Sequence, residues 1–495
     1  MTWRELLTAV AGTFPFDAVD VIVTSSAPSQ GSASDVTSVA YDSRQVVSGS
    51  VFVALRGVHA DGAAFARDAV ARGAVAVVSE AAAPAGHRVA WLQVSDARLA
   101  MAALASALFR HPSDALTLVG ITGTNGKTTT VQMLAAMLRA AGARAVAAGN
   151  VGLALLDAVL ADDPYDVIAV ELSSFQLHWT HSLRPFAAAV LNLAPDHIDW
   201  HGSYAAYAAA KGRIYDRCQV ACVYNAGDPS TEELVRTARA EDGCLAVGFT
   251  LGVPGVGLLG VVDDVLIDRA FLPERSLHAA ELASVSDVRP LAPHNVENAL
   301  AAAALARAYG ASPAAVREGL RSFVPDAHRI ARVARLHEVD WVDDSKATNP
   351  HAASASLRAF SSVVWIAGGL AKGADFDDVV TAAAGRLRGV VLIGRDRADV
   401  AAALARHAPD VPVVEVARTD TGAMDDVVRA AASLAGPGDT VLLAPACASM
   451  DMFLSYAHRG EVFAAAVQDL AAAVDPRGPT QSSRPMQTSP PEARP

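Results

Sequence analysis

The sequence predicts an α/β protein with three domains and parallel sheets. The chain has 495 residues, which is about three times the ~150 residues of a usual domain. Short runs rich in β-branched residues alternate with Ala-rich segments of helical length. The runs are apolar throughout, which is typical of parallel strands covered by helices on both faces. Together these observations indicate an α/β architecture.

Two X-Pro steps suggest the domain limits, because the residue before a proline disfavours helix. Residues 1–112 are expected to form a small α/β domain with strands at Val51–Leu55 and Ala74–Val78. Residues 113–324 form the expected central domain, with strands at Leu116–Ile121, Asp166–Leu172, Ala187–Leu193 and Val220–Tyr224. Residues 325–474 form the expected C-terminal domain, with strands at Val363–Ile366, Val390–Ile393, Val413–Val416 and Thr440–Leu443.

Composition excludes several classes of protein. The net charge of −12 and the lack of a Lys/Arg cluster argue against a nucleic-acid partner. No charge-free apolar run reaches the ~18 residues of a membrane helix, and the N-terminus does not resemble a signal peptide. We therefore expect a cytoplasmic protein without a membrane partner. The sequence does not indicate an oligomeric state, and we take a monomer as the default. Residues 475–495 are rich in Pro, Ser and Gln and lack apolar periodicity, which predicts a disordered tail.

The four cysteines, Cys218, Cys222, Cys244 and Cys447, include no Cys-x-x-Cys pair. This spacing supports neither a disulfide framework nor a zinc ribbon. We expect reduced cysteines with a structural role.

A phosphate-binding loop follows the first strand of the central domain. Its residues are Gly123, Thr124, Asn125, Gly126, Lys127, Thr128 and Thr129. Glycines let backbone N–H groups approach a phosphate, the lysine adds positive charge, and the start of the following helix contributes its dipole. The loop departs from the general P-loop pattern, because Ile121 stands where that pattern has its first glycine.

Acidic and basic side chains follow the next strands. Glu171 lies at the carboxyl end of an expected strand, where open parallel sheets place ligand groups. His197 comes after the following strand, and Lys211 lies on a later helix. His197 and His201 have the i,i+4 spacing of a zinc pair, but no third ligand is evident and we do not favour zinc.

These segments resemble the Mur ligase family, and in particular its glutamate-adding branch. The matching motifs are Gly-Thr-Asn-Gly-Lys-Thr-Thr at 123–129, Glu-Leu-Ser-Ser-Phe-Gln at 171–176 and Asp-His-x-Asp at 196–199. The resemblance implies an ATP-dependent, ADP-forming ligase that makes an amide bond through an acyl phosphate. It also implies a P-loop ATPase fold for the central domain and a Rossmann-like, amino-acid-binding C-terminal domain.

The resemblance assigns catalytic roles to Lys127, Glu171, His197 and Lys211. Two magnesium ions are expected, one held by Thr128 and Glu171 and the other by His197 and Lys211. Lys211 would carry CO2 as a carbamate, which turns a cation into an oxygen ligand that suits magnesium. Asn150 and Ser173 would line the site of the muramoyl substrate.

Further motifs match the ATP site. His294, Asn295 and Asn298 open an expected helix, and amide side chains carry the donor and acceptor that adenine requires. By resemblance, Arg329, Asp344 and Lys346 would complete the ATP site.

The acceptor amino acid would bind nearby. Glutamate has two carboxylates, so its site needs a cation and hydroxyl donors. By resemblance these are Lys372, Thr348, Ser449 and Tyr456, the last standing where the family has phenylalanine.

The N-terminal segment resembles the UDP-binding domain of the MurE and MurF branches instead. Ser43 and Arg44 lie in an Asp-Ser-Arg turn that can offer a hydroxyl and a guanidinium to a diphosphate. The resemblance as a whole implies that D-glutamate is added to UDP-N-acetylmuramoyl-L-alanine, as in the synthesis of peptidoglycan precursors for the cell wall.

Two alternatives stay open from the sequence. The chain could use L-glutamate or another amino acid, as a MurE-like or folylpolyglutamate synthase-like enzyme would, although the Asp-Asn-Pro-Arg motif of the diaminopimelate-adding branch is absent. It could also be an inactive ATP-binding scaffold, although such a scaffold should have lost a metal ligand or a lysine.

Overall fold

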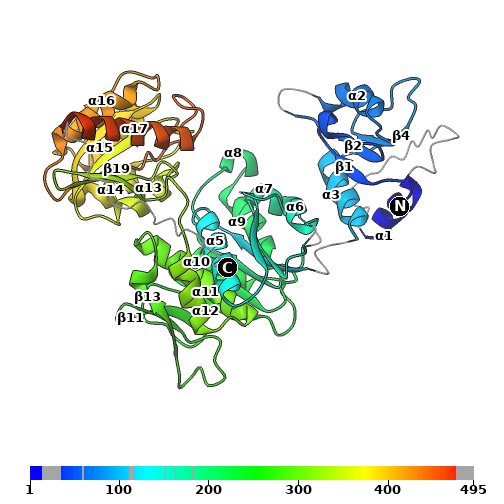
Figure 1. Ribbon diagram of the computed structural model, residues 1–495, viewed down its shortest axis with the longest axis horizontal. Helices are drawn as coiled ribbons and strands as arrows, with labels where there is room; N and C mark the ends of the chain where they lie inside the picture. The colour runs from blue at the N-terminus through cyan, green and yellow to red at the C-terminus, as the bar shows by residue number, and fades with distance from the viewer. Residues whose placement is uncertain are drawn as a thin grey trace, which may run out of the picture.

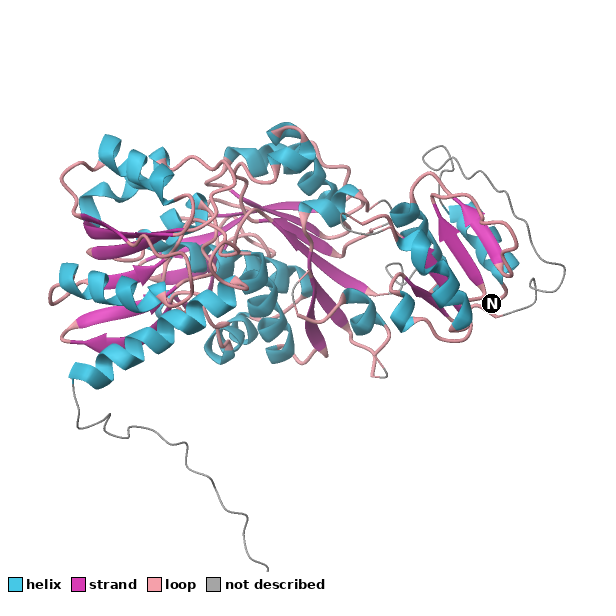
Figure 2. Ribbon diagram, turned by 90° about the horizontal axis from the view of Figure 1, so that it is seen from above, coloured by secondary structure: helices cyan, strands magenta, loops and turns pink. Residues whose placement is uncertain are grey.

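The computed structural model describes residues 1–13, 35–57, 61–110, 116–150, 152–161, 163–180 and 183–474. Within these ranges the chain forms three sheets, and each sheet is the centre of a separate lobe (Figure 1). The N-terminal and C-terminal lobes lie at opposite ends of the molecule, with the central lobe between them (Figures 1 and 2). The predicted tail at 475–495 and the junction at His111-Pro112 lie outside the described residues.

The N-terminal lobe is a small parallel sheet with helices. Its strands run in the order β1-β2-β3-β4, and all neighbours are parallel. The strands are β1 (Ser38–Ala40), β2 (Ser50–Ala54), β3 (Ala76–Ser79) and β4 (Ala90–Gln93), and the helices are α1 (Trp3–Thr13), α2 (Ala66–Ala71) and α3 (Ala97–Leu108). The two strands expected here are confirmed as β2 and β3.

The central lobe contains a nine-stranded sheet in the order β13-β12-β11-β10-β9-β8-β5-β7-β6. Its parallel strands are β5 (Thr117–Thr122), β6 (Ala145–Gly149), β7 (Val167–Glu171), β8 (Ala187–Val190), β9 (Ala221–Asn225), β10 (Leu245–Phe249) and β11 (Leu258–Val262). The four expected strands are confirmed as β5, β7, β8 and β9.

The sequence did not predict the antiparallel edge of this sheet. Strands β12 (Val265–Asp268) and β13 (Ala280–Ser284) pair antiparallel with their neighbours. Glycines and a proline interrupt the apolar run before them. The β11–β12 turn uses Asp263 and Asp264 with φ of 45° and 64°, which is the left-handed pair of a tight hairpin turn.

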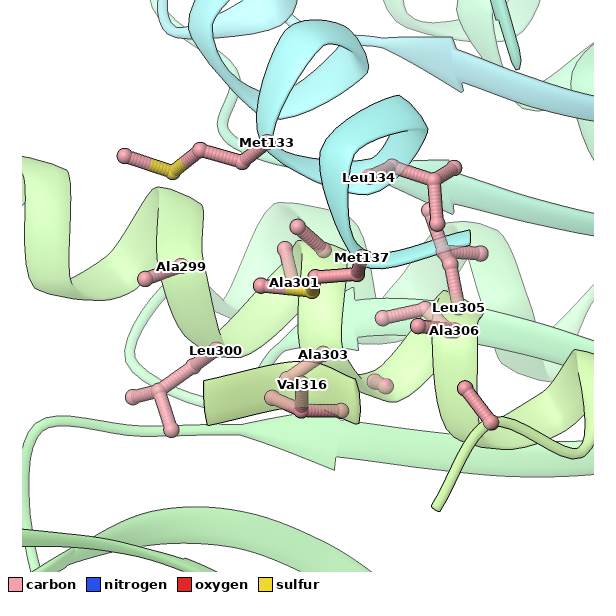
Figure 3. Close-up of a cluster of buried hydrophobic side chains, with 14 of the residues drawn as sticks. Met133, Leu134, Met137, Ala299, Leu300, Ala301, Ala303, Leu305, Ala306 and Val316 are labelled. Atoms are coloured by element: carbon pink, nitrogen blue, oxygen red, sulfur yellow. The ribbon is translucent and has the colours of Figure 1, made fainter. Parts of the chain in front are cut away.

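A layer of three helices holds the start of α5 (Lys127–Ala140) and the start of α11 (Pro293–Tyr309) next to each other. Helices α5, α11 and α12 (Pro313–Ser322) pack through Met133, Met137, Leu305 and their neighbours in one buried cluster (Figure 3). Alanines along α11 are buried around its whole circumference, so the three helices approach closely. This packing sets the first turns of α5 and α11 beside each other.

Shorter helices complete the central lobe. They are α6 (Leu155–Val159), α7 (Ser174–His178), α8 (Ile198–His201), α9 (Tyr204–Gly212) and α10 (Pro229–Arg236). No helix in the described ranges combines the length and apolar content needed to cross a membrane.

The C-terminal lobe has a six-stranded sheet in the order β14-β15-β19-β16-β17-β18. The strands are β14 (Ala331–Leu336), β15 (Val339–Asp343), β16 (Val363–Gly368), β17 (Leu387–Ile393), β18 (Val413–Glu415) and β19 (Thr440–Leu443), and the helices are α13 (Pro350–Leu357), α14 (Asp377–Ala383), α15 (Arg397–His407), α16 (Ala423–Leu434) and α17 (Tyr456–Val474). Separate buried clusters cover its two faces. All neighbouring strands are parallel except the antiparallel pair β14 and β15, as expected for a Rossmann-like lobe.

Candidate functional site

A cavity of about 700 Å³ lies between the central and C-terminal lobes. The central lobe contributes the loop after β5, residues at the carboxyl ends of β7, β8 and β9, and the start of α11. The C-terminal lobe contributes residues between Arg329 and Arg358. Carboxyl ends of parallel strands are where open α/β sheets bind ligands.

The phosphate loop joins β5 to α5, as predicted. Gly126 precedes the first helical residue with φ of 83°, and a Cβ atom there would collide with Asn298 Oδ1. Lys127 Nζ donates to the carbonyl oxygens of Gly123 and Thr124, both at 3.0 Å. Burial lowers the pKa of Lys127, and the charges of Glu171 and Asp196 oppose that effect.

Glu171 makes hydrogen bonds with two other predicted residues, Thr128 and Asn150. Its carboxylate is buried at the end of β7 and accepts hydrogen bonds from Thr128 Oγ1 at 2.8 Å and Asn150 Nδ2 at 3.4 Å. Gly149, with φ of 119°, permits the close approach, because a Cβ atom there would collide with the Glu171 carbonyl. A hydroxyl and a carboxylate thus meet beside the phosphate loop, and such oxygen donors suit a hard cation such as magnesium.

Lys211 lies behind the phosphate loop and does not line the cavity. Its side chain is buried, and Nζ donates to the Gly123 carbonyl at 2.8 Å and to Thr122 Oγ1 at 3.3 Å. Burial, and then the charge of Lys127, lower the pKa of Lys211 well below its ordinary value. The environment therefore favours a neutral amine.

His197 lines the cavity just before α8. It adopts a left-handed conformation with φ of 52°, and its ring packs against Phe175 with centroids 4.8 Å apart. His201 contacts Ser174 Oγ at 3.0 Å instead. Within the described ranges, no third His, Cys, Asp or Glu joins this pair in a metal-binding group, so zinc remains unsupported there.

The start of α11 supplies three predicted residues to the cavity. Asn298 accepts from Thr130 Oγ1 and donates to Asn295 Oδ1, both at 3.3 Å, which ties α11 to α5. His294 is half-buried, and burial of its ring lowers its pKa to about 4. Its Nδ1 has no hydrogen-bond partner among the described residues.

Arg329, Asp344, Lys346 and Thr348 enter the cavity from the C-terminal lobe. Asp344 is buried and accepts from the Ile330 amide at 3.2 Å and from Ser356 Oγ. Burial raises the pKa of Asp344 to about 7. The Lys346 ammonium lies 3.9 Å from the centre of the Tyr456 ring.

The other three residues assigned to glutamate, Lys372, Ser449 and Tyr456, do not line this cavity. Backbone hydrogen bonds nevertheless hold their loops together. Leu370 and Ala448 exchange bonds of 2.9 and 3.1 Å, and the Ala446 amide donates to Ala347 at 2.9 Å. The loops after β15, β16 and β19 therefore lie next to one another. Together they form one surface beside Thr348.

Three residues assigned to the muramoyl substrate lie away from the cavity. Ser43 and Arg44 belong to the N-terminal lobe, where Arg44 pairs with Asp42 at 2.7 Å and lowers the pKa of Asp42 to about 2. The Ser173 hydroxyl accepts from the Gln176 amide at 3.2 Å and caps α7. Only Asn150 among the four lines the cavity.

Sequence reasoning missed several polar contacts. Asn125 Nδ2 meets His351 Nδ1 at 2.9 Å, and Asn349 Nδ2 donates to Asn125 Oδ1 at 3.2 Å, so the phosphate loop touches α13 of the other lobe. Asn349 is the last residue of the Asp-Ser-Lys-Ala-Thr-Asn motif at 344–349, so this motif could have indicated it as a site residue. Nothing in the sequence marks His351.

Arg459 was also missed. Its guanidinium is fully buried in α17 and donates to Ser345 Oγ and the Ser345 carbonyl, both at 2.8 Å, and to the Cys447 carbonyl at 3.2 Å. Burial lowers the pKa of Arg459 to about 10. The side chain connects two of the loops around the candidate glutamate site.

Family models match most of the chain in three segments. These are "Mur ligase family, catalytic domain" over residues 35–108, "Mur ligase middle domain" over 121–306 and "Mur ligase, glutamate ligase domain" over 328–447.

Individual proteins match as well. The UDP-N-acetylmuramoylalanine–D-glutamate ligase of Streptomyces coelicolor is 66% identical over 354 residues, which are 72% of this chain and 75% of that protein. MurF from Acinetobacter baumannii is similar in fold, with a TM-score of 0.65 at 21% identity over 88% of this chain and 94% of that one. MurF from Thermotoga maritima in complex with ADP has a TM-score of 0.60 at 20% identity, over 88% and 99% of the two chains. The chain belongs to the Mur ligase family.

Proposed function

We propose that this protein joins D-glutamate to the alanine carboxylate of UDP-N-acetylmuramoyl-L-alanine, with ATP converted to ADP and phosphate. This reaction is a step of peptidoglycan precursor synthesis. The main support is the 66% identity to a relative named for that activity. The cavity supplies the matching chemistry, because it gathers Lys127, Thr128 and Glu171 beside one phosphate loop.

The central lobe would hold ATP. The amides and Lys127 of the phosphate loop suit its phosphates, and the amides of Asn295 and Asn298 with His294 suit the adenosine side. Arg329 and Lys346 approach from the C-terminal lobe and would balance the charge that develops during phosphoryl transfer. Chemistry would thus require groups from both lobes.

Two pairs of side chains near the phosphate loop would bind magnesium. Thr128 Oγ1 and the Glu171 carboxylate would hold one ion, and His197 with a carbamate on Lys211 would hold another. Bound magnesium would neutralise phosphate charge and polarise the transferred group. The low pKa of Lys211 favours the carbamate, because a neutral amine adds to CO2 and releases one proton as the N–C bond forms.

The reaction would proceed in two covalent steps. A carboxylate oxygen of the alanine bonds to the γ-phosphorus while the bond to the β,γ-bridging oxygen breaks and ADP leaves. The glutamate amine then attacks the acyl carbon and loses a proton. The tetrahedral intermediate expels phosphate, which carries the original carboxylate oxygen.

D-Glutamate would bind against the C-terminal lobe. Thr348, Ser449 and Tyr456 offer hydroxyls and Lys372 offers a cation, which suits an acceptor with two carboxylates. The connected loops after β15, β16 and β19 support this placement. Arg459 would act as a positioning residue that holds two of those loops.

The UDP group would bind to the N-terminal lobe, as the resemblance of that segment to MurE and MurF suggests. Ser43 and Arg44 lie on the short helix η2 (Ser43–Gln45), and the Arg44 guanidinium is exposed. Ser173 and Asn150 would contact the muramoyl part between the lobes. The three lobes would correspond to domains at 1–112, 113–324 and 325–474.

A phosphate-release assay tests the proposed function. Purified protein is given Mg-ATP and UDP-N-acetylmuramoyl-L-alanine with D-glutamate, L-glutamate or meso-diaminopimelate in separate reactions. Turnover with D-glutamate alone is expected. Turnover with L-glutamate or meso-diaminopimelate but not with D-glutamate would overturn the proposed specificity. No phosphate release with any of the three would favour an inactive scaffold.

A further inference from the structure

Three cysteines that are separate in the sequence meet in the central lobe. The sulfur atoms of Cys218, Cys222 and Cys244 all lie within 4.8 Å of one another. Cys218 follows the short helix η4 (Arg213–Tyr215), Cys222 lies in β9, and Cys244 immediately precedes β10. They gather near the amino ends of β9 and β10, whereas Asn225 and Phe249 at the carboxyl ends line the ATP cavity.

The spacing of the sulfur atoms matches a tetrahedral metal site. The Cys222 and Cys244 sulfur atoms are 3.7 Å apart. Zn–S bonds of ~2.3 Å in tetrahedral geometry place neighbouring sulfurs about 3.8 Å apart. A zinc ion can therefore contact both sulfurs with little movement, and the third thiol lies within the same small volume.

The backbone register argues against a disulfide between Cys222 and Cys244. Cys222 is level with Ala246 on the neighbouring parallel strand, so Cys244 lies two residues away along the strand direction. A strand spacing of ~4.8 Å and two rises of ~3.3 Å separate the Cα atoms by roughly 8 Å. A disulfide needs a Cα separation of about 4.4–6.8 Å, so it would require the backbone to move.

Backbone hydrogen bonds already hold the three segments in place. The Glu241 amide donates to the Cys218 carbonyl at 2.9 Å, the Cys244 amide to the Glu241 carbonyl at 3.0 Å, and the Leu245 amide to the Val220 carbonyl at 2.9 Å. The thiol cluster is therefore organised before any ion binds, and little conformational entropy would be lost on binding.

The fourth ligand would come from solvent. Cys218 and Cys222 are buried, whereas Cys244 is partly exposed, so the cluster opens on the Cys244 side. Glu241 is the nearby carboxylate, but both its oxygens accept from Arg184 at 2.6 and 2.9 Å. A site with three protein ligands and one open position results.

We propose that Cys218, Cys222 and Cys244 form a binding site for a thiophilic d¹⁰ cation, and that Zn²⁺ occupies it with one solvent ligand. The ion would fasten the segment before β10 to the start of β9. It would act on stability without entering the ligase chemistry, because the thiols are at the opposite ends of these strands from the cavity.

Metal binding by the full-length chain tests this site. Reduced protein is stripped with a chelator, reloaded with Zn²⁺ and desalted, and bound zinc is measured by mass spectrometry. About one ion per chain is expected. Loading with Co²⁺ instead should give thiolate-to-cobalt charge-transfer absorption. Cys222→Ala and Cys244→Ala should weaken Zn²⁺ binding by at least ~100-fold, since even changes outside the ligand shell cost 10–100-fold.

Cys447→Ala is the matched control, because Cys447 is a buried cysteine of the C-terminal lobe, and it should bind zinc like the parent chain. If the cluster variants do not fold, alkylation of the cysteines in the unaltered chain tests whether Zn²⁺ binds to the cluster. Zn²⁺ should slow modification of Cys244 and leave that of Cys447 unchanged. No stoichiometric zinc in the parent chain, equal binding by Cys244→Ala, or equal alkylation with and without zinc would overturn the site.

Discussion

Lys127 and Lys211 donate to the same acceptor, the Gly123 carbonyl, at 3.0 and 2.8 Å. Lys211 is buried and Lys127 is partly exposed at the cavity, and burial is the first cause that lowers the pKa of each. The charge of Lys127 disfavours a second positive charge on Lys211, which is one cause of the lowered pKa of Lys211. Conversion of Lys211 to a carbamate would replace this repulsion with a cation–anion pair and add oxygen ligands for a metal. The contact between the two lysines therefore supports the proposed carbamate, as the family resemblance does.

Lys211→Ala should therefore abolish turnover. Loss of a pre-organised electrostatic group typically lowers kcat by a factor of about 10²–10³. In this variant the proposed metal ligand is lost as well. Acetate added to the variant should restore part of the rate, because it supplies a small carboxylate to the space left by the side chain. Steady-state phosphate release measures both effects. Substantial activity of the variant without acetate and without a response to bicarbonate would contradict the role.

Asp344 should make stability depend on pH near neutrality. Its folded-state pKa of about 7 lies above its ordinary value, so between these values the folded state holds a proton that the unfolded state has released. The free energy of unfolding should therefore fall as pH rises, by up to about 3 kcal/mol between about pH 5 and pH 8. Asp344→Asn should remove this decline. Urea denaturation without nucleotide measures it, and an equally steep decline in the variant would exclude Asp344 as its source.

At the scale of elements, apolar runs predicted β2, β3, β5, β7, β8, β9 and the four strands β16 to β19. They did not predict the parallel strands β1, β4, β6, β10 and β11. Nor did they predict the β11–β12 and β14–β15 hairpins. These turns use Asp263-Asp264 and His337-Glu338 with positive φ, where glycine or asparagine would have signalled a tight turn. The phosphate loop was predictable because its function requires consecutive residues. Contacts such as Asn125 with His351 join positions 226 residues apart, and no local pattern records them.

The two ends of α5 offer a matched pair of glycine variants, Gly126 before the helix and Gly142 after it. Gly126 and Gly142 both have positive φ, but a Cβ atom at Gly126 would collide with Asn298, whereas a Cβ atom at Gly142 would meet nothing within 4 Å. Alanine should cost each about 1–2 kcal/mol of stability through left-handed strain. Only Gly126→Ala should also weaken ATP binding, because it displaces Asn298 and reshapes the loop. Calorimetric ATP titration distinguishes them, and equal ATP affinity in both variants would refute the proposed role of the loop.

At the scale of the whole molecule, the site is divided among lobes. The cavity draws residues from the central and C-terminal lobes, whereas Ser43 and Arg44 lie on the N-terminal lobe at one end of the molecule (Figure 1). The sequence motifs indicated a set of residues for the ATP side, and all of these except Gly123 line the cavity. They could not predict how loops from separate strands assemble around Arg459, which bonds to Ser345 114 residues away.

The N-terminal lobe should contribute affinity for the UDP substrate alone. Arg44→Ala should raise KM for UDP-N-acetylmuramoyl-L-alanine about tenfold, since a lost hydrogen bond to a charged group costs about 1.5–3 kcal/mol. KM for ATP should stay the same. Arg67→Ala, at an exposed arginine on α2 of the same lobe, is the control. An unchanged KM for the UDP substrate in Arg44→Ala would remove Arg44 from the site.

Transfer of a carboxylate oxygen to phosphate tests the central claim most directly. UDP-N-acetylmuramoyl-L-alanine labelled with oxygen-18 in its alanine carboxylate is incubated with the protein, Mg-ATP and D-glutamate, and the released phosphate is analysed by mass spectrometry. Activation through an acyl phosphate predicts that each phosphate released carries one labelled oxygen and that the amide product keeps the other. Unlabelled phosphate released together with product would contradict this mechanism.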